Sequence, residues 1–324
     1  MDYLLLLVGL GLLLLSADFL VDSSVAIAQR ARISNFLIGL TIVGIGTSAP
    51  ELLVSISSAL SGSGDIAMGN VVGSNICNTF LILGVAAAIM PFAIERETQR
   101  RDIPVAIVAS LLVIALASDS IIPGISENTV SRIDGIFLLI VFFAYMCYVV
   151  VLKGRNPQQA LADADEQTKS RFSGKNPVLL GFIAVASLAG LVFGGNLFLD
   201  SAKTLARTWG MSEAVISITI VAIGTSLPEL ITVIVAASKK NAQLALGNVL
   251  GSNVFNLLMI LGVSSTIKPI TVVGVTIVDF LVLLLGAVLT YVVIFTFGKH
   301  KFDRIEGFIF IAIYIGYTIS LLLR

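Results

Sequence analysis

Charged side chains are scarce in this 324-residue chain, because Asp, Glu, Lys and Arg make up only 12% of it. An average soluble domain carries about twice that fraction, so an ordinary water-soluble globule is excluded. Neither sign of charge is in excess, since 20 basic residues balance 20 acidic ones. A basic nucleic-acid-binding surface and an acidic solvated tail are therefore both unexpected, and we expect no nucleic acid among the partners.

Cysteine and histidine are also rare, with two cysteines and one histidine. Cys77 and Cys147 lie inside apolar stretches and His300 lies in a loop, so they cannot form a thiolate or imidazole metal cage. Intramembrane proteolysis by a serine–histidine pair is disfavoured for the same reason. We therefore expect no resident cofactor and a protein that is not an enzyme.

Long apolar segments are abundant, and 57% of the residues are hydrophobic. Ten segments approach the roughly 20 residues that a membrane-spanning helix needs. They are continuous rather than alternating, which predicts helices and argues against a closed barrel. The expected fold class is all-α, a polytopic protein of the lipid bilayer with ten transmembrane helices. The expected spans are 3–21, 36–60, 66–90, 103–122, 135–152, 178–199, 215–238, 244–267, 273–297 and 305–323.

Most of the 20 lysines and arginines fall on one side of these ten spans. Basic residues in short loops stay in the cytoplasm. The predicted location is the cell membrane, multi-pass, with both termini outside and the central loop 153–177 in the cytoplasm. The amino terminus has Asp2 and no basic residue before its apolar run, so we expect a permanent first span rather than a cleaved signal peptide.

An internal repeat organises the chain. Residues 44–84 align with 222–262 at a constant offset of 178 without a gap, and 20 of the 41 paired positions are identical. The expected organisation is a five-helix repeat at 1–152, a linker at 153–177 and a second five-helix repeat at 178–324. An odd number of spans per repeat inverts the second half relative to the first. Many secondary transporters have this plan and bind their ions near the midplane, between the repeats.

The first repeated motif is Gly-Thr-Ser-x-Pro-Glu, at 46–51 and again at 224–229. A carboxylate in mid-span is costly unless it is paired, so Glu51 and Glu229 are functional candidates, and inverted repeats bring them to one site. Each proline lacks an amide hydrogen, which predicts a kink near Thr47 and an equivalent kink in the second repeat. A carbonyl freed there is a hard oxygen ligand. A merely structural kink is the alternative, which the paired glutamates and the exact repetition disfavour.

The second repeated motif is Gly-Asn-x-x-Gly-Ser-Asn-x-x-Asn, at 69–78 and 247–256. Its polar residues four apart share one helical face, which predicts a stripe turned toward protein or water. Gly69 and Gly73 are expected to let a neighbouring backbone come close. Ion-ligand roles are expected for Ser74, Asn78, Ser252 and Asn256. Two roles, ion ligand or interhelical hydrogen bonding, stay open for Asn70, Asn75, Asn248 and Asn253.

The candidate ligands are all oxygens, a set of carboxylates, carbonyls, hydroxyls and amides that suits calcium and also sodium. Magnesium fits less well because it keeps its waters. Two carboxylates neutralise one calcium ion or two sodium ions, whereas both kinds of ion at once leave excess positive charge. Such mutual exclusion is what an exchanger requires.

With both motif pairs intact, the chain resembles compact prokaryotic members of the sodium/calcium exchanger family, within the calcium/cation antiporter superfamily, over essentially its whole length. The motifs correspond to that family's two alpha repeats. The resemblance implies electrogenic exchange of several sodium ions for one calcium ion by alternating access, with the first and sixth helices sliding across a static core. It implies a calcium site formed by the carboxylates of Glu51 and Glu229 and the carbonyls of Thr47 and Thr225. The implied sodium ligands are Gly44, Thr47, Ser48, Ser74, Ala222, Thr225, Ser226 and Ser252, with Asn78 and Asn256 as further polar positions.

Departures from other relatives narrow the expected coupling. Potassium-dependent relatives carry an aspartate where this chain has Asn256, which favours potassium independence. Proton-coupled relatives read more like Gly-Asn-Ala-x-Glu at the first motif, so a calcium/proton antiporter is the less favoured alternative. A cation channel usually assembles a pore from rings of equivalent residues, so the inverted repeat argues against a channel. The linker has no room for a calcium-sensing domain, and no obligate protein partner is evident.

Four aspartates near span ends receive no ion-binding role in this interpretation: Asp18, Asp22, Asp200 and Asp279. Asp22 and Asp200 match between the repeats, and Asp200 lies three residues before Lys203, a helical pairing distance. We expect these aspartates to act in interfacial anchoring or packing.

Overall fold

The computed structural model describes residues 2–119, 128–153, 170–211, 222–296 and 301–323. Each of the ten predicted spans falls on helical segments, although the start of span 215–238 and most of the central linker lie outside the described residues. Within the described part, six helices are each long and apolar enough to cross a membrane. A seventh span results when the bent pair Asn35–Thr47 and Ala49–Ser61 counts as one. The predicted all-α, polytopic fold class is confirmed.

The helices follow the order of the predicted spans, and several are interrupted by π-helical turns. The first half comprises α1 (Asp2–Ala31), α2 (Asn35–Ile38), η1 (Gly39–Val43), α3 (Gly44–Thr47), α4 (Ala49–Ser61), α5 (Gly64–Ile76), η2 (Cys77–Ile82), α6 (Leu83–Ile89), η3 (Thr98–Asp102), α7 (Ile103–Leu116), α8 (Arg132–Tyr148) and η5 (Val149–Lys153). The second half comprises α10 (Pro177–Thr208), α12 (Ala222–Gly224), α13 (Leu227–Ser238), α14 (Ala242–Val254), η7 (Phe255–Ile260), α15 (Leu261–Ile267), α16 (Ile277–Val292), η8 (Val293–Phe295) and α17 (Arg304–Leu322).

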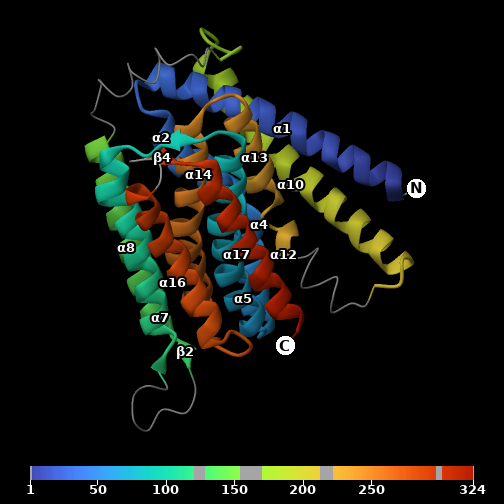
Figure 1. Cartoon of the computed structure of the whole chain (residues 1–324), viewed down its shortest axis with the longest axis vertical. Helices are drawn as coiled ribbons and strands as arrows, with labels where there is room; N and C mark the ends of the chain where they lie inside the picture. The colour runs from blue at the N-terminus through green and yellow to red at the C-terminus, as the bar shows by residue number, and fades with distance from the viewer. Residues whose placement is uncertain (1, 120–127, 154–169, 212–221, 297–300, 324) are drawn as a thin grey trace.

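Four two-residue strands join the two halves. β1 (Phe92–Ala93) pairs antiparallel with β4 (Lys301–Phe302), and β2 (Thr129–Val130) pairs antiparallel with β3 (Ile270–Thr271). β1 and β3 are equivalent at the offset of 178, and β2 and β4 are equivalent after a shift of six residues. The two ladders lie at opposite ends of the helix bundle (Figure 1). Equivalent elements at opposite ends are the geometry of an inverted repeat, as the odd number of spans predicts.

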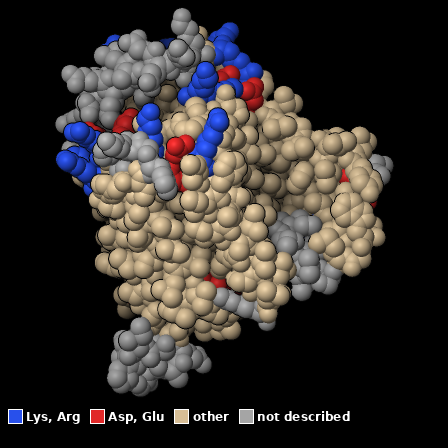
Figure 2. Space-filling view, in the orientation of Figure 1, with Lys and Arg blue, Asp and Glu red and all other residues tan. Residues whose placement is uncertain are grey.

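Lysine and arginine side chains gather at one end of the molecule, whereas its middle is largely free of visible charge (Figure 2). This end, where α1 and α13 end and β4 lies, is called the basic end below. The opposite end is where α4 and α10 end and β2 lies (Figure 1). The largely uncharged surface between the two ends on this face is expected to face lipid.

α1 and α10 lie side by side as an antiparallel pair, oblique to the remaining helices (Figure 1). Their backbones touch, because a Cβ added to Gly9 would lie 2.7 Å from the Phe198 nitrogen and one added to Gly194 would lie 3.1 Å from the Gly9 oxygen. A small core lies between this pair and the bundle, with residues from α1, α10, η1 and α13, while the end of α1 also contributes Val21, Val25 and Ala28 to the large core. The small core comprises Leu13, Ala17, Leu20, Val43, Ala184, Leu191 and Ile231.

Close backbone packing of the second motif is seen in its second copy. A Cβ added to Gly247 would lie 2.3 Å from the Phe36 oxygen, and one added to Gly251 would lie 2.2 Å from the Leu40 oxygen, so α14 packs directly on α2 and η1. Among the described residues, nothing lies within 4 Å of a Cβ added to Gly69 or Gly73. The segment equivalent to α2 and η1 in the second repeat, residues 213–221, lies outside the described residues, so the close approach predicted at these two glycines stays a prediction. This part of α5 borders a cavity of about 240 Å³ shared with α16 and α17.

Two π-helical segments occupy equivalent positions in the halves, η2 after α5 and η7 after α14. They were not predicted from the sequence. Asn78 lies in η2 and Asn256 lies in η7, so the regular stripe with a spacing of four residues ends at Ser74 and at Ser252. Such π turns inside α-helices are frequent at functional sites.

Candidate ion-binding site

The glutamates lie where helices are interrupted by the first motif. α3 ends at Thr47 and α4 begins at Ala49 with Pro50 in its first turn, and the segments on either side of the break are bent by 44°. The predicted kink near Thr47 is confirmed. The second half repeats the arrangement, with a break between α12 and α13. Glu51 and Glu229 therefore each lie in the first turn of a helix, where the helix dipole favours negative charge.

Each glutamate is enclosed and is held by a serine of the other half. Glu51 has 0% of its surface exposed and Glu229 has 1%. Ser48 Oγ donates to Glu229 Oε1 at 2.8 Å, and Ser226 Oγ donates to Glu51 Oε1 at 3.2 Å. The Oε2 atom of both glutamates lacks a hydrogen-bond partner among the described residues. Two buried carboxylate oxygens without donors are costly unless they bind a cation or a proton.

Thr47 and Ser252 connect the break in the first half to α14. Ser252 Oγ donates to the Gly44 carbonyl at 3.1 Å, and Thr47 Oγ1 donates to Asn248 Oδ1 at 3.2 Å. Ser252 Oγ also lies 3.4 Å from Asn248 Oδ1. These four residues are buried, and the Ser252–Gly44 and Thr47–Asn248 hydrogen bonds cross from one repeat to the other. The interhelical hydrogen-bonding role left open for Asn248 is thereby confirmed.

Asn70 supports the helix that carries Glu51. Its Nδ2 donates to the Glu51 carbonyl at 3.0 Å and to Ser55 Oγ at 2.9 Å, which joins α5 to α4. Ser55 was not predicted from the sequence, and the internal repeat does not indicate it, because the equivalent residue is Val233. Asn70 therefore has the interhelical hydrogen-bonding role as well.

The other two open asparagines differ from each other. Asn253 Nδ2 donates to Thr79 Oγ1 at 2.9 Å, which joins α14 to η2, so the interhelical role is confirmed there. Asn75 Nδ2 donates at 2.7 Å to the Val71 carbonyl of its own helix. Neither contact involves a glutamate of the first motif.

Ser74, Asn78 and Asn256 come from the two helices that contain π turns. Asn256 Nδ2 donates to Ser74 Oγ at 3.1 Å, again between the repeats. Asn78 is 0% exposed, and neither atom of its amide group has a hydrogen-bond partner in the described part of the chain. Asn256 Oδ1 is likewise without a partner there. These amide oxygens are therefore available to a cation or a water molecule.

The donor set around the glutamates contains only two carboxylates. Within the described residues, no group of three or more His, Cys, Asp and Glu side chains could hold a metal ion. Any ion bound here would therefore combine two carboxylates with neutral hydroxyl, amide and carbonyl oxygens. Such a set of hard oxygen ligands suits calcium or sodium better than soft or transition metals.

A cavity of about 300 Å³ reaches this region from the end opposite the basic end. Thr225 and Pro228 line it on one side, and Asn196 and Asp200 of α10 line it on the other. Thr225 is partly exposed, whereas the equivalent Thr47 is 1% exposed. The first motif is therefore buried at Thr47 and borders a cavity at Thr225. The cavity ends at Thr225 and Pro228, which adjoin Ser226 and Glu229 in the sequence.

Most of the predicted site residues meet through hydrogen bonds between the repeats. The connected residues are Gly44, Thr47, Ser48, Glu51, Ser74, Ser226, Glu229, Ser252 and Asn256. Asn78 is enclosed without such a bond, and Thr225 borders the cavity. Ala222 begins α12, and its side chain lies outside the described residues.

Comparison with known proteins gives concordant results. The family model described as sodium/calcium exchanger protein matches residues 1–151 and 179–323. Sodium/calcium exchanger MaX1 of Methanosarcina acetivorans is 32% identical over 344 residues, which cover 99% of this chain and 98% of the relative. Inner membrane protein YrbG of Escherichia coli is 34% identical over 270 residues, which cover 82% and 79%. A solved structure of the sodium-calcium exchanger NCX_Mj, soaked with 2.5 mM sodium and 0.1 mM calcium, is 32% identical with a TM-score of 0.81, covering 99% of this chain and 98% of that one.

Proposed function

Because this chain belongs to the sodium/calcium exchanger family, we propose that it is a secondary active antiporter that exchanges sodium for calcium across a membrane. The observation that carries this proposal is the pair of enclosed glutamates, each held by a serine of the opposite repeat and each with one oxygen left without a donor. Sodium and calcium are its substrates rather than resident cofactors, and the protein acts as a transporter rather than as an enzyme.

The calcium ion binds between the two glutamates in this proposal. Two carboxylates neutralise its charge in a region from which water is largely excluded, and the Thr47 and Thr225 carbonyls complete the hard oxygen set. Two sodium ions neutralise the same two charges, so calcium and sodium compete for one pair of carboxylates. The proposed sodium ligands and site-lining residues are Gly44, Thr47, Ser48, Ser74, Asn78, Ala222, Thr225, Ser226, Ser252 and Asn256.

Alternating access in this proposal comes from a movement of α1 and α10 as one unit over the remaining helices. Two features support it: these helices touch each other through glycine backbones, and they lie obliquely across the remaining helices (Figure 1). Several sodium ions move for each calcium ion, so the exchange is electrogenic. Asn256, a neutral side chain, makes the exchange independent of potassium.

The proposed orientation places the basic end, including the linker at 153–177, in the cytoplasm and both termini outside. The repeats at 1–152 and 178–324 are then the two halves of one transporter. Calcium/proton exchange, the alternative predicted from the sequence, is not favoured by these family matches.

Sodium should drive calcium uptake by the purified protein. Proteoliposomes loaded with sodium and diluted into sodium-free buffer are expected to accumulate ⁴⁵Ca²⁺, and potassium on either side should leave the initial rate unchanged. The measurement is the initial rate of uptake, with sodium, potassium and pH gradients varied separately. Uptake that depends on a proton gradient and is independent of sodium would contradict the proposal and indicate calcium/proton exchange.

The two serines that hold the glutamates should tune ion binding. Ser48→Ala removes the hydroxyl that donates to Glu229 at 2.8 Å, and Ser226→Ala removes the weaker contact to Glu51 at 3.2 Å. We expect the internal sodium concentration for half-maximal uptake to rise by about threefold to tenfold in Ser48→Ala, because an oriented hydrogen bond to a carboxylate is lost. A smaller rise is expected in Ser226→Ala. Unchanged sodium dependence in both variants would contradict a role for these serines.

A further inference from the structure

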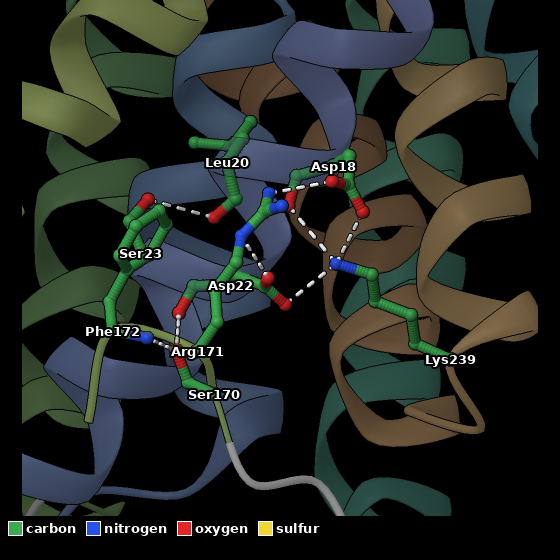
Figure 3. A network of polar contacts seen from close by, with 8 residues as sticks. All are labelled: Asp18, Leu20, Asp22, Ser23, Ser170, Arg171, Phe172 and Lys239. Atoms are coloured by element: carbon green, nitrogen blue, oxygen red, sulfur yellow. Dashed lines mark hydrogen bonds and ion pairs between the residues drawn. The ribbon is translucent and has the colours of Figure 1, made fainter.

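Four charged side chains form a compact cluster at the basic end (Figure 3). Asp18 and Asp22 lie one turn apart on α1, Lys239 directly follows α13, and Arg171 belongs to the linker before α10. Lys239 Nζ lies 2.6 Å from one carboxylate oxygen of each aspartate. Arg171 lies 2.6 Å from Asp18 and 2.7 Å from Asp22 through two different nitrogens. The cluster therefore ties α1 to the core helix α13 and to the linker.

The linker side of this cluster is also packed. The Arg171 guanidinium lies 4.2 Å from the ring centroid of Phe19, and Ser170 Oγ donates to the Asp22 carbonyl at 2.7 Å. The Asp22 side chain is only 12% exposed and that of Lys239 is 25% exposed. Ion pairs that are partly withdrawn from water and share their partners hold geometry better than isolated surface pairs.

The inverted repeat supplies a built-in comparison for this cluster. At the offset of 178, Asp18 and Asp22 of α1 correspond to Asn196 and Asp200 of α10. In place of a cluster, the opposite end has the open cavity of about 300 Å³, which Asn196 and Asp200 line. The α1/α10 pair is therefore bound to the core by ion pairs at the basic end, whereas a cavity separates it from the core at the opposite end.

The region around Asn196 and Asp200 lacks an equivalent of Lys239. Lys239, at the end of α13, corresponds to Ser61 at the end of α4, so no equivalent positive charge faces Asp200 from α4. Asp200 pairs instead with Lys203 of its own helix at 3.4 Å. That contact joins α10 to itself and fastens nothing to the core.

Burial beneath the helix pair differs in the same direction. Leu53 of α4, which lines the open cavity, is 63% exposed, whereas the equivalent Ile231 of α13 is 8% exposed within the small core. The structure is thus closed over α13 near the basic end and open over α4 near the opposite end. In a state that is open over α13 at the basic end and closed over α4 at the opposite end, the ion pairs of the cluster must break. No lysine or arginine of α4 is available to form equivalent ion pairs with Asp200.

We propose that Asp18, Asp22, Arg171 and Lys239 form a latch that holds the α1/α10 pair closed at the basic end and biases the transporter toward the state open at the opposite end. Lys239 is its central positioning residue, because it joins both aspartates to the core helix. This inference rests on the proposed function only in taking α1 and α10 as the moving unit. Removing the latch shifts the population toward the state open at the basic end.

The test uses two reporter cysteines with opposite expected responses. Ile231→Cys and Leu53→Cys are introduced separately into full-length protein in which Cys77 and Cys147 are replaced by alanine. Each is combined with Lys239→Gln and reconstituted, and the rate of modification by a small hydrophilic maleimide is measured from both sides of the membrane. Lys240→Gln is the matched control, because it removes the same charge from the next, exposed residue.

Lys239→Gln is expected to raise the labelling rate at the Ile231→Cys reporter by roughly threefold to tenfold and to lower it at the Leu53→Cys reporter, the response of a shifted two-state equilibrium. Lys239→Arg should preserve both wild-type rates because the charge is retained, and Lys240→Gln should change neither. The proposal is overturned if Lys239→Gln leaves both rates unchanged, or raises both together as general loosening does.

The same experiment separates this proposal from the proposed function. Labelling requires no ion gradient, so a latch is detected whichever ions the protein exchanges. Absence of sodium-driven ⁴⁵Ca²⁺ uptake in the unsubstituted protein would contradict the exchange activity and leave the opposite labelling responses intact. Normal uptake with unchanged labelling in Lys239→Gln would contradict the latch alone.

Discussion

Replacing either Glu51 or Glu229 with glutamine is expected to abolish calcium transport, lowering the initial rate of ⁴⁵Ca²⁺ uptake by about 100-fold or more. Glutamine keeps the size and one carbonyl oxygen, so the serine hydroxyl of the opposite repeat still has an acceptor. The negative charge, in contrast, is lost. A buried calcium ion that faces only one carboxylate therefore keeps an uncompensated positive charge. That charge is expensive where the surroundings replace water poorly.

Folding must be monitored beside transport in these variants. Both glutamates are buried, and glutamine removes the repulsion between their two negative charges. The thermal unfolding midpoint of each variant should therefore equal or exceed that of the unsubstituted protein. Asp279→Asn is the matched control, since Asp279 is also a buried carboxylate, 5% exposed, but it caps α16 and accepts a hydrogen bond from Tyr317. We expect that variant to lose stability and to keep sodium-driven uptake. Near-normal exchange in either glutamine variant would remove the basis of the site assignment.

Gly251→Ala should be the most damaging of the small substitutions. The added Cβ would lie 2.2 Å from the Leu40 carbonyl oxygen and 2.7 Å from two further backbone atoms of that residue. Backbone cannot rotate away as a side chain can, so α14 must separate from η1. We expect a loss of roughly 3 kcal/mol or more in the free energy of unfolding, at or beyond the upper end for overpacked cores. Displacement of Ser252 from the Gly44 carbonyl should also impair sodium-driven uptake.

Gly316→Ala is the control, because Gly316 is an exposed glycine inside α17. No described residue lies within 4 Å of an added Cβ there, and alanine favours the helical state over glycine by about 1 kcal/mol. The unfolding midpoint in detergent, measured by a fluorescence thermal-shift assay, should fall in Gly251→Ala and hold or rise in Gly316→Ala. Equal midpoints in the two variants would contradict the crowding of Gly251 by the Leu40 backbone.

Local chemistry accounts for the features that were predicted correctly. Continuous apolar segments predict helices in lipid wherever they occur, and the kink near Thr47 follows from a proline that lacks an amide hydrogen. The repeated motifs identified Glu51 and Glu229 because a mid-span carboxylate is unfavourable in any membrane helix. Residues of the first motif were therefore found without knowledge of their neighbours. Ser55 was missed because its role depends on Asn70 of another helix and is not repeated.

The sequence by itself determined the helical spans, their inverted repetition, the breaks at the prolines and the oxygen-rich chemistry of the candidate site. Tertiary structure alone decided that Ser48 reaches Glu229, 181 residues away, and that Asp22 meets Lys239. It also decided that the backbone of Leu40 crowds Gly251. The physical reason is that helix propensity and the cost of burying a charge act within one segment. Contacts between segments depend on which surfaces pack together, and the same motif in two repeats packs against different neighbours.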